Sequence, residues 1–228
     1  MFWLFILDVI FTDNHMRELL IIGARGFGRE TYRTFVNTKA YKDGKVTVKG
    51  FLDDNSAALN GLNGDWPPII GAVETYDVQP NDVFFCALGD SHWRKHYAEI
   101  IEEKGGCFIN IIHPMALISP IATIGKGCFI GPFTTISPNV LIGNHVMIHS
   151  FDDLGHDVEI GDYASIESYV FLGGYAKVGE LSTMHTKSSI IPHKCIGKEC
   201  VVGFGSVVMR NIKDGIHVFG NPAKKIIW

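Results

Sequence analysis

Aliphatic residues recur at every sixth position through the second half of the chain. The uninterrupted series comprises Ile112, Ile118, Ile124, Ile130, Ile136, Ile142, Ile148, Leu154, Ile160, Ile166, Leu172, Val178, Met184, Ile190, Ile196, Val202 and Val208. A glycine often follows a member of this series, and a small side chain often stands four residues after it, as at Ala116, Cys128 and Ala164. An α-helix requires a period near 3.6 and a flat sheet a period of 2. A period of six therefore predicts a left-handed parallel β-helix, whose repeats bury a shared core only by stacking.

The first half of the chain has a different pattern, in which short apolar runs alternate with turns and helical segments. The pattern predicts strands at 19–22, 46–52 and 82–88, a short strand or turn at 69–71, and helices ending near 37 and spanning 91–104. Strand, glycine turn, helix and strand in succession indicate a Rossmann-like α/β domain. We predict an N-terminal extension at 1–15, the α/β domain at 16–106, the β-helix at 107–213 and a C-terminal tail at 214–228.

Composition and charge exclude some classes of protein. The net charge of −4 and the lack of a basic run argue against a nucleic-acid surface. Five cysteines without metal-ligand spacing suit a reducing cytoplasm. The apolar stretch at 2–11 is short and interrupted by Asp8, so we expect no stable membrane insertion, although a peripheral contact through Phe2, Trp3, Leu4 and Phe5 stays open.

His156 and Asp157 are the first candidate for chemistry. Three hexads make one triangular coil, so residues 18 apart stack at about the 4.8 Å strand spacing, and His156 should lie one coil below Gly174. Acyl transfer needs a base to take the proton of the attacking group and an N–H to stabilise the oxyanion. The pair and Gly174 can supply both. The alternative is that His156 is a solvated turn residue and Gly174 merely a corner.

The glycine turn of the α/β domain is the second candidate. Gly23-Ala24-Arg25-Gly26-Phe27-Gly28 has the spacing G-x-x-G-x-G rather than the dinucleotide spacing G-x-G-x-x-G. Such a turn can hold phosphates at a helix N-terminus, and Asp53, at the end of the second strand, can reach a ribose or base. The glycines could instead serve only tight strand–helix packing.

Over nearly all of residues 16–228 the sequence resembles the bacterial sugar acyltransferases of the sialic acid O-acetyltransferase type, which include UDP-4-amino-sugar N-acetyltransferases. The resemblance is carried by the segments at 21–28, 51–54, 87–90 with Arg94, 112–114, 118–120, 155–162 and 218–225. It implies a homotrimer with acetyl-CoA between neighbouring β-helices. His156 would then be the general base, Asp157 its orienting partner, and the Gly174 N–H a contact to the thioester carbonyl.

The resemblance also implies two sets of binding residues. The expected acetyl-CoA contacts are Gly174, Gly203, Asn221, Pro222, Ala223 and Lys224. The expected contacts to a nucleotide-linked sugar are Gly23, Arg25, Gly26, Phe27, Gly28, Asp53, Asp54, Gly89, Arg94 and His149. We expect no metal.

Three positions depart from the family pattern, and the first two of them lie near the acceptor or acyl group in the family. Family members commonly have Asn in the region of His149, a second histidine at the position of Ser165, and a polar residue at the position of Phe27. The sequence therefore leaves the acceptor sugar undetermined. We expect an N-acetyltransferase of a nucleotide-activated sugar in surface-glycan synthesis, with a sugar O-acetyltransferase as the alternative.

Rivals from other classes are a γ-type carbonic anhydrase, an NAD-binding protein and a structural β-helix. His149, Glu167 and His185 are 18 residues apart and stack in one column, which can be read as the zinc site of the carbonic anhydrase. Ile190, however, stands where a third histidine is needed. That reading also leaves 16–105 without a role. The glycine spacing is wrong for NAD, and a structural β-helix leaves the His156–Asp157 pair unexplained.

Overall fold

The computed structural model describes residues 16–226, which divide into two compact units, one ending at Pro114 and the other beginning at Met115. The predicted N-terminal extension at 1–15 and the last two residues of the predicted tail lie outside the described residues. Within residues 16–226, no helix combines the length and the apolar character that crossing a bilayer requires.

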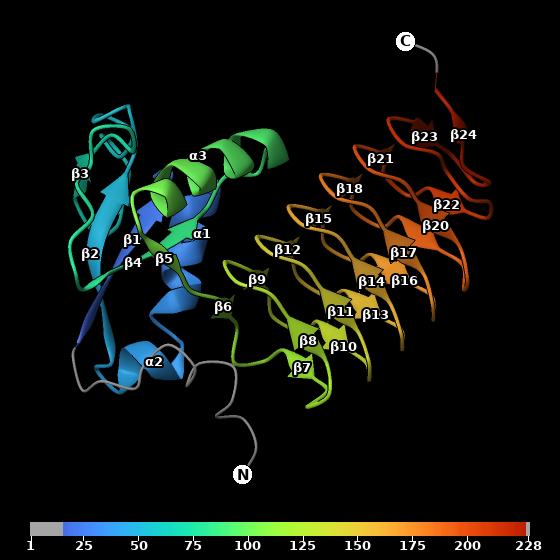
Figure 1. Ribbon diagram of the computed structural model, residues 1–228, viewed down its shortest axis with the longest axis horizontal. Coiled ribbons are helices and arrows are strands. Elements are labelled where there is room, and N and C mark those ends of the chain that lie inside the picture. Colours follow the sequence, from blue (N-terminus) through green and yellow to red (C-terminus); the bar gives the residue numbers. More distant parts are fainter. Residues whose placement is uncertain (1–15, 227–228) are drawn as a thin grey trace. The chain divides into compact units, whose positions relative to one another are not determined.

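The first unit contains a parallel sheet with the strand order β3-β2-β1-β4-β5 (Figure 1). Its strands are β1 (Arg17–Ile22), β2 (Val46–Leu52), β3 (Ile69–Gly71), β4 (Asp82–Cys86) and β5 (Cys107–Phe108), and the short β6 (Ile111–Ile112) follows them in the chain. Its helices are α1 (Gly26–Phe35), α2 (Lys39–Lys42) and α3 (Ser91–Glu103). The central strands β1 and β4 are apolar and buried, as expected for a parallel sheet covered on both faces.

The order of the strands reverses beside β1. The chain runs outward from β1 to β2 and β3, and then returns to place β4 on the other side of β1. In open α/β sheets, ligands bind outside the carboxyl ends of the strands at such a reversal. The loops that follow β1 and β4 are therefore the part of this sheet where a ligand site is expected.

The predicted strands and long helices of this unit are present, with small shifts at their ends. The strand predicted at 82–88 ends at Cys86, and the helix predicted to end near 37 ends at Phe35. The sequence prediction missed the one-turn helix α2. This helix is capped by Thr38, whose hydroxyl accepts a hydrogen bond from the Tyr41 amide at 3.4 Å.

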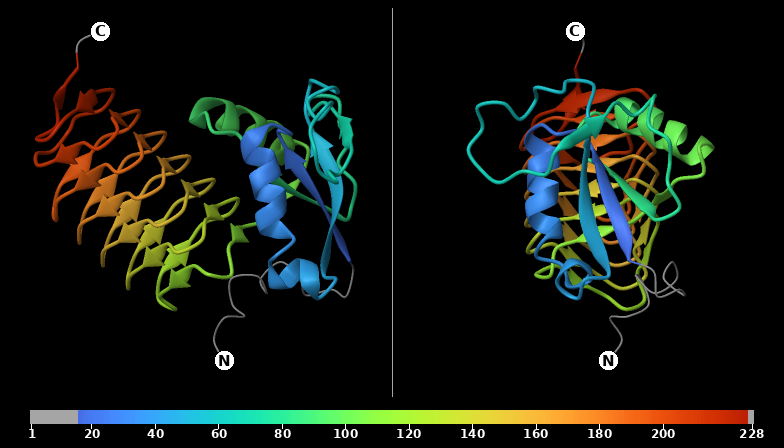
Figure 2. Two further views of the ribbon diagram at one scale, coloured as in Figure 1. Left: turned by 180° about the vertical axis from the view of Figure 1, so that it is seen from behind. Right: turned by 90° about the vertical axis from the view of Figure 1, so that its left-hand side faces the viewer.

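The second unit is a parallel β-helix of the left-handed hexapeptide type, built from two-residue strands on three faces (Figures 1 and 2). The first face contains β7 (Leu117–Ile118), β10 (Thr135–Ile136), β13 (Asp153–Leu154), β16 (Phe171–Leu172), β19 (Ser189–Ile190) and β22 (Val207–Val208). The second face contains β8 (Thr123–Ile124), β11 (Leu141–Ile142), β14 (Glu159–Ile160), β17 (Lys177–Val178) and β20 (Cys195–Ile196). The third face contains β9 (Phe129–Ile130), β12 (Met147–Ile148), β15 (Ser165–Ile166), β18 (Thr183–Met184) and β21 (Val201–Val202).

The six-residue series supplies the core of this β-helix. Each member ends a strand and pairs with residues 18 positions away, as Ile136 does with Ile118 and Leu154. Most of these side chains are fully buried, and the compact residues two positions before them, such as Cys128 and Ala164, are buried as well. Both features follow from the predicted stacking.

The corners of the β-helix have a backbone conformation that the sequence prediction did not foresee. From Phe133 to Glu199, every sixth residue is a non-glycine residue with φ between 53° and 66°. Gly127 and Gly205 continue the series at either end. This left-handed conformation costs a non-glycine residue of order 1–3 kcal/mol. The stacked coils impose it, because corner residues donate their backbone N–H groups to the coil before them, as Tyr175 does to His156 and Leu181 to Asp162.

The C-terminal tail forms two strands, for which the sequence pattern gave no prediction. It forms β23 (His217–Phe219), which pairs with β21, and β24 (Lys224–Lys225), which pairs with β23 in antiparallel fashion. Ala223 also donates its N–H to the Val207 carbonyl at 2.8 Å. The tail therefore covers the last coil of the β-helix.

Candidate active site

His156 and Asp157 occupy the corner between the first and second faces, between β13 and β14. Asp157 has φ of 60° and donates its backbone N–H to Pro138 in the coil before it, at 3.1 Å. The His156 carbonyl accepts the Tyr175 N–H from the coil after it, at 3.0 Å. The backbone of both residues is thus fixed by the neighbouring coils.

The two side chains form a hydrogen-bonded pair. His156 Nδ1 lies 2.8 Å from Asp157 Oδ2, and Asn139 Nδ2 donates to Asp157 Oδ1 at 3.2 Å. The hydrogen bond with His156, followed by that from Asn139, holds the pKa of Asp157 below its ordinary value. An ionised carboxylate beside Nδ1 favours the tautomer with the proton on Nδ1, which leaves Nε2 as an acceptor.

The backbone of Gly174 lies directly over the imidazole. A Cβ at this position would stand 2.8 Å from His156 Nε2 and 2.9 Å from Cε1, so a side chain here would force the imidazole to move. The corresponding amides at other corners donate to side chains, as Asn144 does to Asp162 and Thr186 to Glu167. Among the described residues, the Gly174 N–H has no such acceptor. The imidazole of His156 therefore lies against a residue whose backbone N–H is unused among the described residues.

Gly203 and the tail residues predicted to contact acetyl-CoA come together at another corner. Gly203 follows β21, between the third and first faces, and Phe219 of the tail packs on it so closely that a Cβ at Gly203 would collide with its ring. Beside them, the Ala223 N–H donates a hydrogen bond to the Val207 carbonyl, and Lys224 is exposed in β24. Within one chain, these residues do not share a corner with His156 and Gly174.

His149 lies at this second corner, in a column with Glu167 and His185. Glu167 accepts hydrogen bonds from His185 Nδ1 at 3.0 Å and from the N–H and hydroxyl of Thr186 at 3.0 and 3.1 Å. His149 contacts Phe129 through its ring, with centroids 6.1 Å apart. Among the described residues, no three metal-ligating side chains lie close enough to hold one ion.

In the first unit, the glycine turn and Asp53 are directly connected. Asp53 Oδ2 accepts the Ala24 N–H at 2.8 Å, and Oδ1 accepts the Asn55 N–H at 2.9 Å. A Cβ at Gly28 would collide with the Gly23 carbonyl, so this glycine is required for close packing of α1 on the end of β1. Gly26 has open space around its Cα. Gly28 therefore has the structural role that the sequence left open, and Asp53 holds the turn in place.

The predicted residues after β2 and β4 lie near this turn. Gly23 has φ of 93° and donates to the Leu52 carbonyl at 2.8 Å, and a Cβ on it would meet Leu88. Asp54 accepts a hydrogen bond from the Tyr97 hydroxyl at 3.1 Å. The carboxyl ends of β1, β2 and β4 thus meet where the strand order reverses.

Arg94, Gly89, Arg25 and Phe27 have different surroundings within this region. Arg94 is fully buried and donates from Nη1 to the carbonyls of Leu88 at 2.7 Å and Gly89 at 3.3 Å, so it braces the turn between β4 and α3. Arg25 is exposed at the start of α1, and Phe27 is half-buried.

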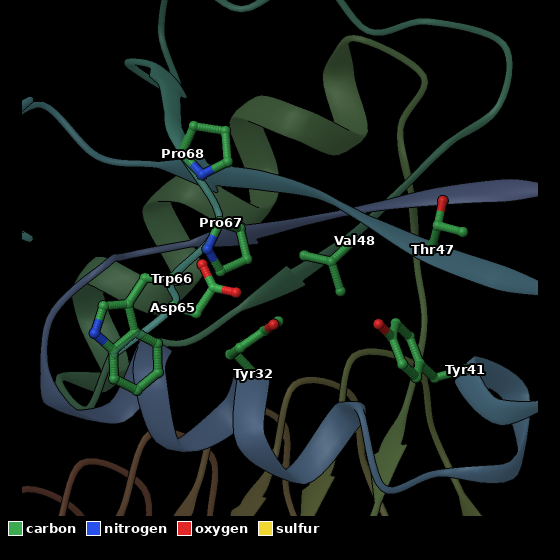
Figure 3. Close-up of a pocket in the computed structure, with 8 residues that line it drawn as sticks. All are labelled: Tyr32, Tyr41, Thr47, Val48, Asp65, Trp66, Pro67 and Pro68. Atoms are coloured by element: carbon green, nitrogen blue, oxygen red, sulfur yellow. The ribbon is translucent and has the colours of Figure 1, made fainter. Parts of the chain in front are cut away.

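A cavity of about 520 Å³ lies elsewhere in the first unit, and none of the predicted site residues lines it (Figure 3). Its lining is Tyr32, Tyr41, Thr47, Val48, Asp65, Trp66, Pro67 and Pro68. Arg33 lies over the Trp66 ring at 4.7 Å from its centroid. No pattern in the sequence pointed to this cavity, because its residues come from α1, α2, β2 and the loop before β3.

Sequence reasoning also missed two contacts of the His156–Asp157 pair, Asn139 and Tyr175. Both stand 18 residues from Asp157, one in the coil before it and one in the coil after. The same column arithmetic that placed Gly174 over His156 could have found them.

Two family descriptions match separate parts of the chain. Residues 18–101 match the family described as PglD N-terminal domain, and residues 121–151 match that described as bacterial transferase hexapeptide (six repeats). The UDP-N-acetylbacillosamine N-acetyltransferase of Bacillus subtilis (strain 168) is 31% identical over 117 residues, which cover 50% of this chain and 51% of that protein. The matches span about half or less of the curated relatives' length.

Solved structures match a larger share of the chain. The acetyltransferase domain of PglB from Neisseria gonorrhoeae FA1090, in complex with acetyl coenzyme A, has a TM-score of 0.83 and 26% identity, covering 93% of this chain and 100% of that one. PerB from Caulobacter crescentus, in complex with CoA and GDP-perosamine, has a TM-score of 0.80 and 25% identity, covering 93% and 98%. The chain thus combines a segment that matches the PglD N-terminal domain with a segment that matches the transferase hexapeptide repeats, and its fold is similar to that of the PglB acetyltransferase domain.

Proposed function

We propose that the protein is an acetyl-CoA-dependent acetyltransferase that acts on an amino group of a nucleotide-activated sugar in surface-glycan synthesis. The proposal rests on one corner of the β-helix. There His156, paired with Asp157, lies against Gly174, whose N–H is unused among the described residues. The proposal keeps the predicted division into an N-terminal extension, a nucleotide-sugar domain, an acyltransferase domain and a tail. It includes a cytoplasmic location, where a reducing environment would keep the five free cysteines as thiols.

In this proposal, His156 carries the proton. Nε2 takes a proton from the attacking amine as the nitrogen bonds to the thioester carbonyl carbon. The Gly174 N–H donates to the carbonyl oxygen as it becomes negative. The imidazolium then returns the proton to the thiolate of CoA when the carbon–sulfur bond breaks. Asp157 stays ionised and orients the ring, and the lowered pKa of its carboxyl supports that role.

We assign binding of the acceptor's nucleotide to the first unit. The turn at Gly23–Gly28 and the acids Asp53 and Asp54 lie at the reversal of strand order, where α/β sheets bind ligands. The open space at Gly26 leaves the start of α1 accessible to a phosphate. PerB, which resembles this chain, is described with GDP-perosamine, and that supports an amino sugar as the acceptor.

We also propose that three copies assemble, with acetyl-CoA between them. His156 and Gly174 lie at one corner of the β-helix, while His149, Gly203 and Asn221 to Lys224 lie at or near another. The residues predicted for one acetyl-CoA can serve together only if two copies bring different corners to a shared groove. The face between these corners carries exposed apolar side chains, Leu117 and Phe171. Sedimentation that finds only monomer at micromolar concentration would contradict this assembly.

The test of the proposed function is release of the CoA thiol. Wild-type protein is incubated with acetyl-CoA and a panel of nucleotide-linked 4-amino sugars, with free sialic acid as the comparison. We expect turnover with an amino sugar. His156→Ala should lower kcat by about 10²–10⁴ with little change in acetyl-CoA affinity, and Asp157→Asn should cost less. His96→Ala, on the exposed surface of α3, is the control.

The outcomes separate the alternatives. Near-wild-type kcat in His156→Ala would remove this residue from the role of base. Acetylation of free sialic acid as fast as any nucleotide-linked sugar would favour the O-acetyltransferase alternative.

A further inference from the structure

Tyr175 packs against the proposed base from the coil above it. Its ring meets the His156 imidazole edge-on, with the centroids 5.1 Å apart and the planes at 88°. The other side of Tyr175 is covered by His193, which stacks on it at 4.8 Å with the planes at 9°. Tyr175 is therefore held on one side by His193 and limits how the imidazole can turn on the other.

The carboxylate of Asp157 is held by two hydrogen bonds. Asn139, in the coil before it, donates to Oδ1 at 3.2 Å, while Oδ2 is occupied by His156 at 2.8 Å. The carboxylate thus has partners on two successive coils.

The backbone makes this arrangement rigid. Asn139, Asp157 and Tyr175 have φ of 61°, 60° and 61°, so their Cα–Cβ bonds leave the corner in nearly the same direction. Asp157 and Tyr175 also donate their backbone N–H groups to the coil before them, to Pro138 and His156 respectively. Groups fixed in this way lose little conformational entropy when they hold a third group in place.

We propose that Tyr175 and Asn139 are positioning residues for the His156–Asp157 pair. The inference rests on the proposed function and adds two residues to it. Neither group exchanges a proton with substrate. The Tyr175 ring keeps the imidazole plane turned so that Nε2 faces the Gly174 amide, and Asn139 keeps the carboxylate in line with Nδ1. Because a misplacement of about 1 Å can cost roughly 10² in rate, loss of either contact should lower kcat.

The first experiment compares kcat and KM across four variants in the thiol-release assay. We expect Tyr175→Ala to lower kcat about 10–100-fold with KM for acetyl-CoA within about twofold. Tyr175→Phe keeps the ring and should recover most of that loss. Asn139→Gly tolerates the left-handed backbone and should lower kcat about 3–10-fold. The control is Glu199→Gly, which removes an exposed side chain from the same backbone conformation at a different corner, and it should leave kcat unchanged.

The result that would overturn the proposal is a kcat for Tyr175→Ala within twofold of wild type. A loss that Tyr175→Phe does not recover would also overturn the role of the ring. A merely structural role would lower the melting temperature of Tyr175→Ala and Tyr175→Phe alike, without this difference in kcat.

A second experiment tests the positioning role of Tyr175 without measuring enzyme activity. Crystal structures of Tyr175→Ala and Tyr175→Phe report the imidazole directly. We expect the ring to leave its place opposite Gly174 in Tyr175→Ala and to keep it in Tyr175→Phe. An unmoved imidazole in Tyr175→Ala would refute the positioning role. Wild-type protein that acetylates no acceptor would refute the proposed function and leave this structural readout intact.

Discussion

Asp152 places an acid inside the β-helix, and changing it should alter stability in a way that depends on pH. The side chain occupies an inward position of the hexad and is 1% exposed. Oδ1 accepts the Val170 N–H at 2.8 Å, and Oδ2 has no hydrogen-bond partner among the described residues. Burial raises the pKa of Asp152 from 3.8 to about 8, against a smaller opposing effect of the Val170 hydrogen bond.

The sign and size of the effect follow from proton linkage. Between about pH 4 and pH 8, the folded chain holds a proton on Asp152 that the unfolded chain has released. The free energy of unfolding therefore falls as pH rises, by about 1.4 kcal/mol per pH unit. At pH 7 the accumulated cost is about 4 kcal/mol.

Asp152→Asn removes this titration while keeping an oxygen for the Val170 N–H. The variant should match wild type near pH 4 and be more stable by about 4 kcal/mol at pH 7, which corresponds to roughly 10 °C in Tm for a chain of this length. Thermal unfolding between pH 4.5 and pH 9, at one protein concentration, measures the difference. Asp77→Asn, which changes an exposed loop carboxyl, is the control and should follow wild type at every pH.

A stability difference between Asp152→Asn and wild type that does not change with pH would refute the reasoning. It would mean that the buried carboxyl keeps the same protonation state in the folded and unfolded chains across this range.

Three further changes test other parts of the structure. Gly174→Ala places a methyl group against His156 Nε2 and should lower kcat about 10–100-fold while Tm changes little, as thiol-release kinetics and thermal unfolding would report. Gly28→Ala brings a methyl group into the Gly23 carbonyl and should destabilise the first unit by several kcal/mol, measured by urea denaturation, unless α1 can shift. Asp53→Ala frees the Ala24 and Asn55 amides, so KM for the nucleotide sugar should rise while KM for acetyl-CoA stays nearly constant. An unchanged KM for both substrates would contradict the assignment of nucleotide binding to this turn.

The β-helix could be predicted from the sequence because its core depends on a short, strict repeat. Ile136 and Leu154 are 18 residues apart in the sequence and paired in the sheet, so arithmetic alone places one over the other. The same arithmetic placed Gly174 against His156, and the hypothetical Cβ contact of 2.8 Å agrees with it.

The corners could not be predicted in the same way. Residues with left-handed φ are usually Gly or Asn, yet this series includes Phe133, Tyr169 and Leu181. Their conformation is imposed by hydrogen bonds between coils rather than by their own preferences, so residue type gives no signal. The strands of the tail were not predicted for a related reason, since β23 is held by its pairing with β21 and β24 rather than by a repeat of its own.

In the α/β domain, the sequence indicated which residues meet but not what each of them does. Asp53 was expected to face a ligand, and the structure shows both of its oxygens already bonded to backbone amides. Arg94 was expected to contact substrate, and it lies fully buried against the carbonyls of its own turn. Spacing along a chain cannot distinguish a group that binds a ligand from one that holds the binding loop.

The 18-residue repeat restricts which changes in length this protein can accept. A single inserted residue within a coil would turn the following inward side chains outward until a later deletion restored the alternation. Loss of six residues between His156 and Gly174 would keep the alternation but move Gly174 to another corner, away from the imidazole. Only gain or loss of a whole coil preserves every column. The β-helix can therefore lengthen or shorten by complete coils outside this pair, whereas the spacing between His156 and Gly174 has to stay fixed.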